Sequence, residues 1–389
     1  MYKKIIIIGK LGSAINSGGG HSFIQTFSKI LVDRGINVIF FNYSNKKDKT
    51  HDFDFLKHNK FSIRNIKIRK QPIIANFYDD FFFFLKTFFQ LFKLRDHIFV
   101  FDQPSYVFFF TFFLKKKIVF IHDNNQKDEI KFLKISLKHF FKKLFEKNII
   151  YKYKDKLLLN KKILILFNSK FSLKGYSKDE LIFNFYKENV IYLPLSIIKN
   201  TKLKIKSKIT LNTKKYFYFI SVSHYSKYKN FEKIVEVFNK LIKKDRRIKL
   251  ILIGRNIKKN LLSQTIPISK NIIFTEALKR DEVFEIFNNC FCYINYGVET
   301  FGYSIVEAMA HGLPVISKDQ NSAPSEYIKN NINGFKVTSD EETIDKIKLL
   351  LENKDIYLKL KSNTYKIAEK FSIDSFSKKF FILLNRFNF

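Results

Sequence analysis

Short β-branched and aromatic runs alternate with longer segments of helical periodicity in the first half of the chain. The run Lys4–Gly9 predicts a buried strand, and a glycine-rich turn at Gly18–Gly20 follows it. Residues 23–31 carry apolar side chains at helical spacing and predict a helix that ends at Gly35. Further strands are predicted at Ile36–Phe41, Ile98–Asp102, Lys117–His122 and Ile163–Asn168. This alternation predicts a parallel sheet that helices cover on both faces.

The same alternation restarts after a polar, lysine-rich stretch from Ile198 to Lys215. Its strands are predicted at Tyr216–Val222, Lys249–Gly254, Ile272–Phe274, Cys290–Asn295 and Pro314–Ser317. We therefore predict α/β architecture with two Rossmann-like, doubly wound parallel-sheet domains, residues 1–197 and 198–370. A C-terminal helix within 371–389 is expected to pack back on the first domain. Ligands of such folds bind beyond the carboxyl ends of the strands, so we expect the site in a cleft across which the domains face each other.

The charge of the chain is strongly positive and unevenly distributed. Lys and Arg number 71 against 35 acidic residues, a net charge of +36, in a chain of 389 residues that is 46% apolar. Abundant Lys, Ile, Asn and Phe are typical of an AT-rich genome, which makes a chain basic without any function. Residues 131–170, however, hold twelve lysines against Glu146 and Asp155, whereas residues 301–350 are slightly acidic. A local function therefore adds to the compositional background.

Neither disulfides nor membrane-spanning segments are predicted. Cys290 and Cys292 are the two cysteines, and their apolar surroundings on one expected strand indicate reduced core thiols. The apolar run Ile5–Ile8 ends at Gly9, too short for a signal peptide, and the apolar run Tyr106–Leu114 is too short to span a membrane. We therefore expect a cytoplasmic protein.

The segment Tyr296–Pro314 carries the most informative chemistry of the chain. A strand is expected to end near Asn295 and a short helix to run from Tyr303 to His311, with Gly302 before it and Gly312 after it. A glycine before a helix lets a ligand approach the backbone, and the unpaired first-turn amides with the helix dipole suit a diphosphate. Glu299 and Glu307 flank this position. One carboxylate can face the distal part of a ligand while the other accepts hydrogen bonds from a ribose.

The pattern Glu299-x7-Glu307, with Phe301-Gly302 inside it and Ala308-Met309-Ala310-x-Gly312-x-Pro314 after it, resembles the signature of glycosyltransferase family 4. The resemblance implies a retaining, metal-independent hexosyltransferase with the GT-B fold. It implies that Glu299 contacts hydroxyls of the donor sugar and is catalytic, that Glu307 holds the nucleotide ribose, and that the backbone from Phe301 through Gly302 to Tyr303 holds the diphosphate.

Other segments of the chain match the same family. Ser223-His224 and Lys229 resemble its strand-to-helix turn, where the lysine offsets the charge of the departing nucleoside diphosphate. The family commonly has an arginine five places before that lysine, and this chain has His224 there. Ser322–Glu326 resembles the loop that closes the donor pocket, with Ser322 and Ala323 in place of two glycines.

Three N-terminal features complete the resemblance. Gly19 and Gly20, beside His21, correspond to the turn that brings acceptor and diphosphate together. His122-Asp123 corresponds to an element near the donor sugar, and we expect His122 to orient a hydroxyl of the donor or the acceptor. Asn168-Ser169 follows a later strand at a position that the family also marks.

No metal or other cofactor is expected, and the predicted partners are a nucleotide sugar and a glycan or lipid-linked acceptor, without nucleic acid. Asp52-Phe53-Asp54 spells the metal-binding motif of glycosyltransferases with the other fold, but it falls in a polar region. Residues 131–145 predict a basic amphipathic helix that leans on an anionic membrane surface. Phe-rich residues 81–92 either add anchors there or pack in the core. We therefore expect peripheral association with the inner face of the membrane.

The leading hypothesis is a retaining glycosyltransferase of cell-surface polysaccharide or glycolipid synthesis. An isomerase of nucleotide sugars is the alternative, because that chemistry uses the same scaffold without an acceptor. A nucleic-acid-binding protein is motivated by the charge alone, and the sequence contains no recognisable RNA or DNA module.

Overall fold

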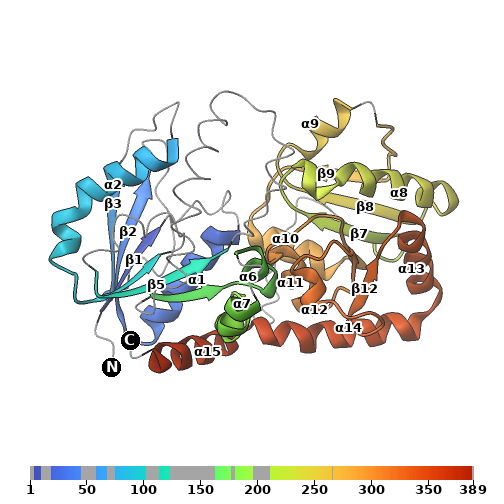
Figure 1. The fold of residues 1–389 in the computed structure, drawn as a ribbon. Helices are drawn as coiled ribbons and strands as arrows, with labels where there is room; N and C mark the ends of the chain where they lie inside the picture. Colours follow the sequence, from blue (N-terminus) through green and yellow to red (C-terminus); the bar gives the residue numbers. More distant parts are fainter. Residues whose placement is uncertain are drawn as a thin grey trace. The chain divides into compact units, whose positions relative to one another are not determined.

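The computed structural model describes residues 4–9, 19–44, 58–67, 75–101, 114–122, 163–176, 180–195, 211–264 and 266–387. Backbone contacts divide the chain into two units. Unit 1 comprises Met1–Pro194 with Phe376–Phe389, and unit 2 comprises Leu195–Ser375. Each unit is built on a six-stranded parallel sheet (Figure 1).

The strands of unit 1 lie in the order β3-β2-β1-β4-β5-β6, which is the strand order of Rossmann folds. Its strands are β1 (Lys4–Gly9), β2 (Asn37–Ser44), β3 (Phe61–Lys67), β4 (Ile98–Phe101), β5 (Lys116–Ile121) and β6 (Ile163–Phe167). Its helices are α1 (Gly19–Asp33), α2 (Ala75–Phe92), α6 (Lys170–Tyr176), α7 (Glu180–Tyr186) and the greater part of α15 (Ile373–Arg386).

Both faces of this sheet are buried, because successive side chains of each strand point to opposite faces. On one face Ile6, Phe99 and Val119 pack with Phe83 of α2 in one core cluster. On the other, Phe120 contacts Phe23 and Phe27 of α1. Phe376 and Phe380 of α15 contact Phe27 as well, which joins the C-terminal helix to unit 1.

Unit 2 repeats the topology of unit 1, with the order β12-β11-β10-β7-β8-β9. Its strands are β7 (Phe217–Val222), β8 (Ile248–Ile253), β9 (Ile272–Thr275), β10 (Cys292–Asn295), β11 (Val315–Lys318) and β12 (Gly334–Val337). Its helices are α8 (Phe231–Lys244), α9 (Ile257–Leu262), α10 (Arg280–Asn288), α11 (Tyr303–Ala310), α12 (Pro324–Tyr327), α13 (Asp340–Glu352) and α14 (Lys354–Ala368). Leu250, Ile294 and Ile316 pack with residues of α8 and α13 in one core cluster on one face.

The expected fold class, two doubly wound parallel sheets, is confirmed, and the differences concern short elements. Strands β3 and β12 were not predicted, because each is an edge strand that is short or alternates with polar residues. Gly19 and Gly20 begin α1 instead of forming a turn, and Cys290 precedes β10 instead of lying in it. Both cysteines are buried and free, as expected. In the part of the chain that the structure describes, no helix is both long and apolar enough to cross a membrane.

Candidate functional site

The switch point of the unit 2 sheet lies between β7 and β10, because the chain leaves β7 toward β8 on one side and reaches β10 on the other. The loops after these two strands start side by side, since β7 and β10 pair in parallel with Phe219 opposite Cys292. A doubly wound sheet binds ligands at this position. Ser223 and His224 follow β7 and Glu299 follows β10, so three of the predicted site residues lie here.

Lys229 is held at this position by contacts between the two loops. It closes the 3₁₀ turn Lys227–Lys229, and the amide of Val298 donates to the Tyr228 carbonyl at 3.2 Å. A Cβ at Gly297 would lie 2.8 Å from Cδ of Lys229, so glycine is what lets the lysine stem pass. Lys229 is buried as a result. Its contacts with the loop after β10 determine where its ammonium group lies.

The ammonium of Lys229 is paired with Glu299, at 2.5 Å between Nζ and Oε1. Only 8% of the lysine side chain and 18% of the glutamate side chain are exposed. The Glu299 carbonyl accepts from the Ala323 amide at 3.0 Å, which ties the loop after β11 to the same place. The structure therefore brings together the residues predicted for the donor sugar and for the diphosphate, and a bound diphosphate would compete with Glu299 for the lysine.

His224 is more exposed than Lys229 and shares its surroundings. Burial of part of the ring lowers the pKa of His224, the cations Lys229 and Arg255 lower it further, and Glu299 opposes them. A neutral imidazole offsets less of the negative charge of a diphosphate than an arginine would. Arg255, next to Gly254 at the end of β8, is a cation at the same edge of the sheet that sequence reasoning did not select.

The amino end of α11 lies at the same edge of the sheet. Gly302 has φ of +82°, and a Cβ there would lie 2.8 Å from the Tyr327 hydroxyl. Ser304 Oγ donates to the carbonyl of Val222 at the end of β7, at 2.9 Å. Among the residues described, the amides of Tyr303 and Ser304 have no hydrogen-bond partner. Two free amides at a helix amino end form an anion site.

Phe301 contributes backbone rather than side chain to this region. Its ring is buried and packs against Phe371 at 5.8 Å between centroids, and its carbonyl accepts from the Tyr327 hydroxyl at 2.7 Å. The Tyr303 hydroxyl is buried and has no hydrogen-bond partner among the described residues. Burial raises the pKa of Tyr303, so this hydroxyl stays protonated and can donate.

Glu307, in the middle of α11, forms an ion pair with Arg280, the first residue of α10. Burial raises the pKa of Glu307, and the adjacent Arg280 guanidinium opposes this rise. Arg280 was missed from the sequence, although a signal exists. A cation in the first turn of a helix interacts unfavourably with the positive end of the helix dipole, so a carboxylate elsewhere in the fold is expected to pair with it.

The segment Ser322–Glu326, expected as a loop, begins helix α12 at Pro324 and reaches this region through the hydrogen bond of the Ala323 amide to the Glu299 carbonyl. Ser322 is 2% exposed, and its hydroxyl has no hydrogen-bond partner among the described residues. Ser322, one of the two residues that stand in place of glycines in the pattern this segment resembles, thus places a buried hydroxyl beside the loop that carries Glu299.

His122 belongs to unit 1 and follows β5, as predicted. Its ring stacks on Phe120 and contacts Phe23, and neither ring nitrogen has a hydrogen-bond partner in the described part of the chain. Burial lowers the pKa of His122 to about 4, so the imidazole is neutral near pH 7. The side-chain amide of Asn168 donates to the His122 carbonyl at 3.1 Å, which links two segments that the sequence singled out separately.

Several expectations fall outside the described residues. These are Gly18, Asp52–Asp54, Asp123 and the basic segment 131–145. Among the residues that are described, no three His, Cys, Asp or Glu side chains lie close enough together to hold a metal ion.

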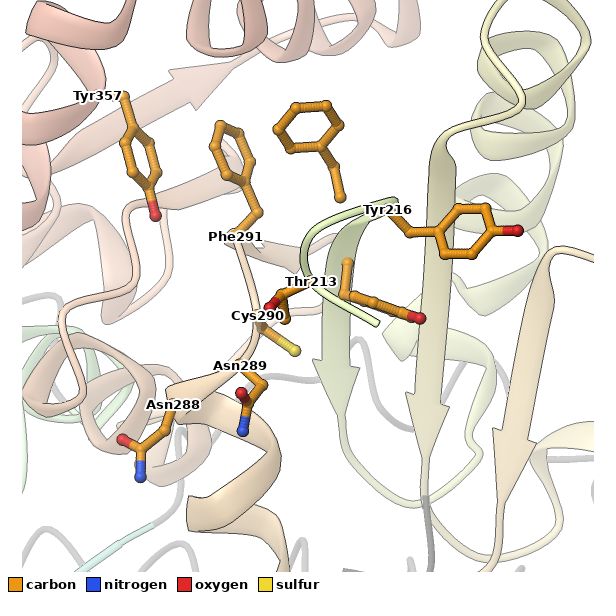
Figure 2. Close-up of a pocket in the computed structure, with 9 residues that line it drawn as sticks. Thr213, Tyr216, Asn288, Asn289, Cys290, Phe291 and Tyr357 are labelled. Atoms are coloured by element: carbon orange, nitrogen blue, oxygen red, sulfur yellow. The ribbon is translucent and has the colours of Figure 1, made fainter. Parts of the chain in front are cut away.

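A pocket of about 240 Å³ lies at the opposite end of the unit 2 sheet from these loops (Figure 2). Tyr216, Asn288, Phe291 and Tyr357 are among its lining residues, and the first three precede β7 and β10. Figure 2 shows Phe291 and Tyr357 next to each other, and their rings stack with centroids 4.2 Å apart. None of the predicted site residues lines this pocket, so we assign it no part in the site.

Residues 202–367 match the family described as "Glycosyl transferases group 1". An uncharacterized glycosyltransferase of Haemophilus influenzae is 24% identical over 199 residues, which cover 49% of this chain and 53% of that protein. The poly(ribitol-phosphate) alpha-N-acetylglucosaminyltransferase of Staphylococcus aureus is 27% identical over 40% of this chain and 33% of that protein. The chain thus spans about half the length, or less, of these curated relatives.

Solved structures share the fold over nearly the whole chain. Anabaena Alr3699/HepE, solved with UDP-glucose, has a TM-score of 0.72 at 17% identity and covers 98% of this chain and 99% of its own. TarM has a TM-score of 0.68 at 16% identity and covers 99% of both chains. At these identities the likeness concerns the fold.

Proposed function

From the premise that residues 202–367 belong to the glycosyl transferases group 1, we propose that the chain transfers a sugar from a nucleotide sugar to a hydroxyl of an acceptor. One observation carries the proposal. Lys229, Glu299 and the open amino end of α11 converge at the switch point of the unit 2 sheet. A cation and free amides offset negative charge, and a flanking carboxylate accepts hydrogen bonds from hydroxyls, which is what a sugar diphosphate requires.

Each residue then has a distinct part in binding the donor. The amides of Tyr303 and Ser304 and the ammonium of Lys229 hold the diphosphate and offset its charge as the glycosidic bond breaks. Glu307 accepts hydrogen bonds from the ribose, and Glu299 accepts them from the transferred sugar. Ser223 and His224 line the diphosphate. The acceptor oxygen bonds to the sugar carbon from the same face on which the bond to the diphosphate breaks, and the hydroxyl proton passes to the departing nucleoside diphosphate. This step needs no covalent nucleophile from the protein and retains the configuration, as in glycosyltransferase family 4.

The similar proteins indicate the classes of donor and acceptor. The Anabaena protein was solved with UDP-glucose, which supports a UDP-sugar donor. The S. aureus relative is named for a poly(ribitol-phosphate) acceptor, and WaaG, with a TM-score of 0.68, for lipopolysaccharide biosynthesis. We therefore propose a glycan or lipid-linked acceptor in cell-surface polysaccharide or glycolipid synthesis, and a reaction without a metal ion.

Unit 1 is proposed to bind the acceptor. His122, half-buried and neutral at the carboxyl end of β5, is suited to orient a hydroxyl, because an unpartnered imidazole nitrogen can accept a hydrogen bond from the hydroxyl or donate one to its oxygen. Gly19 and Gly20 at the amino end of α1 leave room for the diphosphate or the acceptor to approach the backbone.

The proposal extends to peripheral association with the inner face of the membrane. Helix α2 exposes Leu85 at 49%, Phe89 at 77% and Phe92 at 39%, with the exposed cations Lys86 and Lys93 among them. Apolar side chains with interspersed lysines favour the surface of an anionic bilayer.

A thermal-shift screen of the full chain tests the donor site. UDP, GDP, ADP, CMP and their sugars are each added at 100 times the expected dissociation constant, which stabilises a binding protein by about 2.7 kcal/mol. We expect one nucleoside diphosphate to raise the melting temperature, and we expect Glu307→Ala to abolish both this shift and sugar transfer without unfolding the protein.

Two outcomes would oppose the proposal. If no nucleotide raises the melting temperature, the proposed donor site is wrong. If Glu307→Ala transfers the sugar at a near-normal rate, the role proposed for Glu307 is wrong. Conversion of a free nucleotide sugar without an acceptor would favour an isomerase instead.

A further inference from the structure

Arg280 and Glu307 form a pair between two neighbouring helices. Arg280 opens α10, Glu307 lies one helical turn inside α11, and the two helices pack against each other. The guanidinium is paired with Oε1 of Glu307 and also lies over the Phe284 ring, 5.3 Å from its centroid. The arginine is thereby fixed from two sides, by a carboxylate and by an aromatic face.

The pair occupies one oxygen of the carboxylate. Only 12% of the Glu307 side chain is exposed, and the structure gives it no second hydrogen-bond or ion-pair partner among the described residues. Oε2 therefore keeps its capacity to accept hydrogen bonds. A carboxylate that one arginine holds by one oxygen presents the other in a constant direction.

The environment of Glu307 makes this support necessary. Burial raises the pKa of the carboxyl group, and Arg280 is the cation that opposes the rise. The titratable groups that face Glu307 are Tyr303 on its own helix and Tyr293 on β10, and burial raises the pKa of both hydroxyls. His311, at the end of α11, faces Arg280, and burial together with that cation lowers its pKa to about 4, so it is neutral between pH 6 and 8. Tyr365 of α14 lies against Gly312, which follows α11. Neither tyrosine supplies positive charge, so Arg280 is what favours the ionised form.

We propose that Arg280 is a positioning residue of the donor site, which keeps Glu307 ionised and directs its free oxygen to the ribose hydroxyls of the nucleotide. The assignment rests on the proposed function, because it presumes that a nucleotide occupies the site. This assignment adds to the proposed function a residue outside the Glu299-x7-Glu307 segment, Arg280, on which recognition of the ribose depends.

The test compares nucleotides with and without ribose hydroxyls. Isothermal titration calorimetry with the full chain measures UDP, GDP and ADP and their 2′,3′-dideoxy counterparts between pH 6 and 8. The wild type is expected to prefer the ribonucleotide that it binds, with little change over this range. Arg280→Gln is expected to bind that ribonucleotide roughly tenfold more weakly at pH 6, as for a lost hydrogen bond to a charged group, and to recover as the pH rises. Its affinity for the dideoxy form should not change.

Three further variants separate positioning from a merely structural role. Arg280→Lys keeps the charge and should restore part of the preference, and it also serves where Arg280→Gln does not fold. Glu307→Gln should lose the preference for the ribonucleotide at every pH. Adding Arg280→Gln to this variant should not lower the affinity for the ribonucleotide any further. Arg247→Gln removes a surface arginine, paired with Asp245, and is the matched control.

The outcomes distinguish the two proposals. A wild type that binds none of the nucleotides overturns the proposed function. The role of Arg280 alone is overturned if the wild type binds and prefers a ribonucleotide and the Arg280→Gln variant shows the same preference without any pH dependence.

Discussion

The ammonium of Lys229 lies 2.5 Å from the carboxylate of Glu299, although 70 positions separate them in sequence. Each residue was predicted to contact a different part of a sugar diphosphate, and in the structure the two form an ion pair. A buried pair of this kind stabilises less than its Coulomb energy suggests, because both ions lose hydration. It does hold the two side chains in place at the end of the sheet.

Removing the charge of Glu299 is expected to separate binding from transfer. Glu299→Gln should bind the free nucleoside diphosphate as tightly as the wild type or more tightly, because the phosphates no longer compete for Lys229. Transfer should fall by roughly 10- to 100-fold, as for loss of a hydrogen bond to a charged group. Calorimetry and a transfer assay measure the two effects. Glu341→Gln, an exposed carboxylate of the same unit, is the control, and a parallel fall in binding and transfer would contradict the prediction.

A double-mutant cycle measures the coupling of the pair. Lys229→Met and Glu299→Gln should each destabilise unit 2, and the double variant should lose less than their sum by about 1–3 kcal/mol. The exposed pair of Lys29 and Asp33 is the matched comparison and should couple by less than about 1 kcal/mol. Denaturant unfolding of each variant gives the free energies. Equal coupling for both pairs would show that burial of the Lys229 pair adds nothing.

Gly302→Ala is expected to weaken diphosphate binding and to destabilise the protein by about 1–2 kcal/mol, because alanine is unfavourable at φ of +82°. The new Cβ would also meet the Tyr327 hydroxyl at 2.8 Å. Adding Tyr327→Phe removes that collision but not the backbone strain. Thermal melts of the single and double variants separate the two causes. If the double variant melts at the wild-type temperature, the whole loss of stability is due to the collision and none to backbone strain.

Acid is expected to destabilise the protein through His122. The folded imidazole has a pKa of about 4, whereas an unfolded histidine titrates near 6.5. Between these values the unfolded chain binds the additional proton, so stability is lost as the pH falls from about 6.5 to 4, by at most about 3 kcal/mol.

His122→Asn, which cannot titrate there, should flatten part of this dependence in melting curves recorded from pH 4.5 to 7.5. His97→Asn, at a histidine whose ring is far less buried than that of His122, is the control. An unchanged curve for His122→Asn would show that the ring is accessible to protons in the folded state.

Binding to anionic vesicles should depend on helix α2 and on salt. Phe89→Ser together with Leu85→Ser is expected to reduce sedimentation with vesicles that contain phosphatidylglycerol, and salt should release the wild type, because it screens the lysines. Leu358→Ser removes an exposed apolar side chain of unit 2 and is the matched control. Salt-independent binding, or equal losses in both variants, would argue against the membrane surface proposed for α2.

Much of the site was predictable because its signals are local. Gly302, Gly312 and the helix between them follow one another in sequence, and the structure places both glycines at positive φ around α11. The resemblance to glycosyltransferases is supported at the level of group 1 by residues 202–367. The roles given to Glu299, Glu307 and Lys229 stay predictions until a nucleotide is bound.

The unpredicted parts depend on residues far apart in the chain. Edge strands β3 and β12 lack a continuous apolar run, because only one neighbour pairs with them, so their pattern did not stand out. The local signal of Arg280, a cation in the first turn of a helix, names no partner, and its significance depends on α10 packing against α11.

The amino-acid sequence alone determined the alternation of strands and helices, the two doubly wound sheets and the glycine-bounded helix α11, because apolar periodicity and the conformational freedom of glycine act over a few neighbouring residues. Tertiary structure decided which charges meet. Parallel pairing of β7 with β10 brings Lys229 to Glu299, and packing of α10 on α11 brings Arg280 to Glu307. An ion pair requires atoms within a few ångströms, and only the folded chain brings residues so distant in sequence that close.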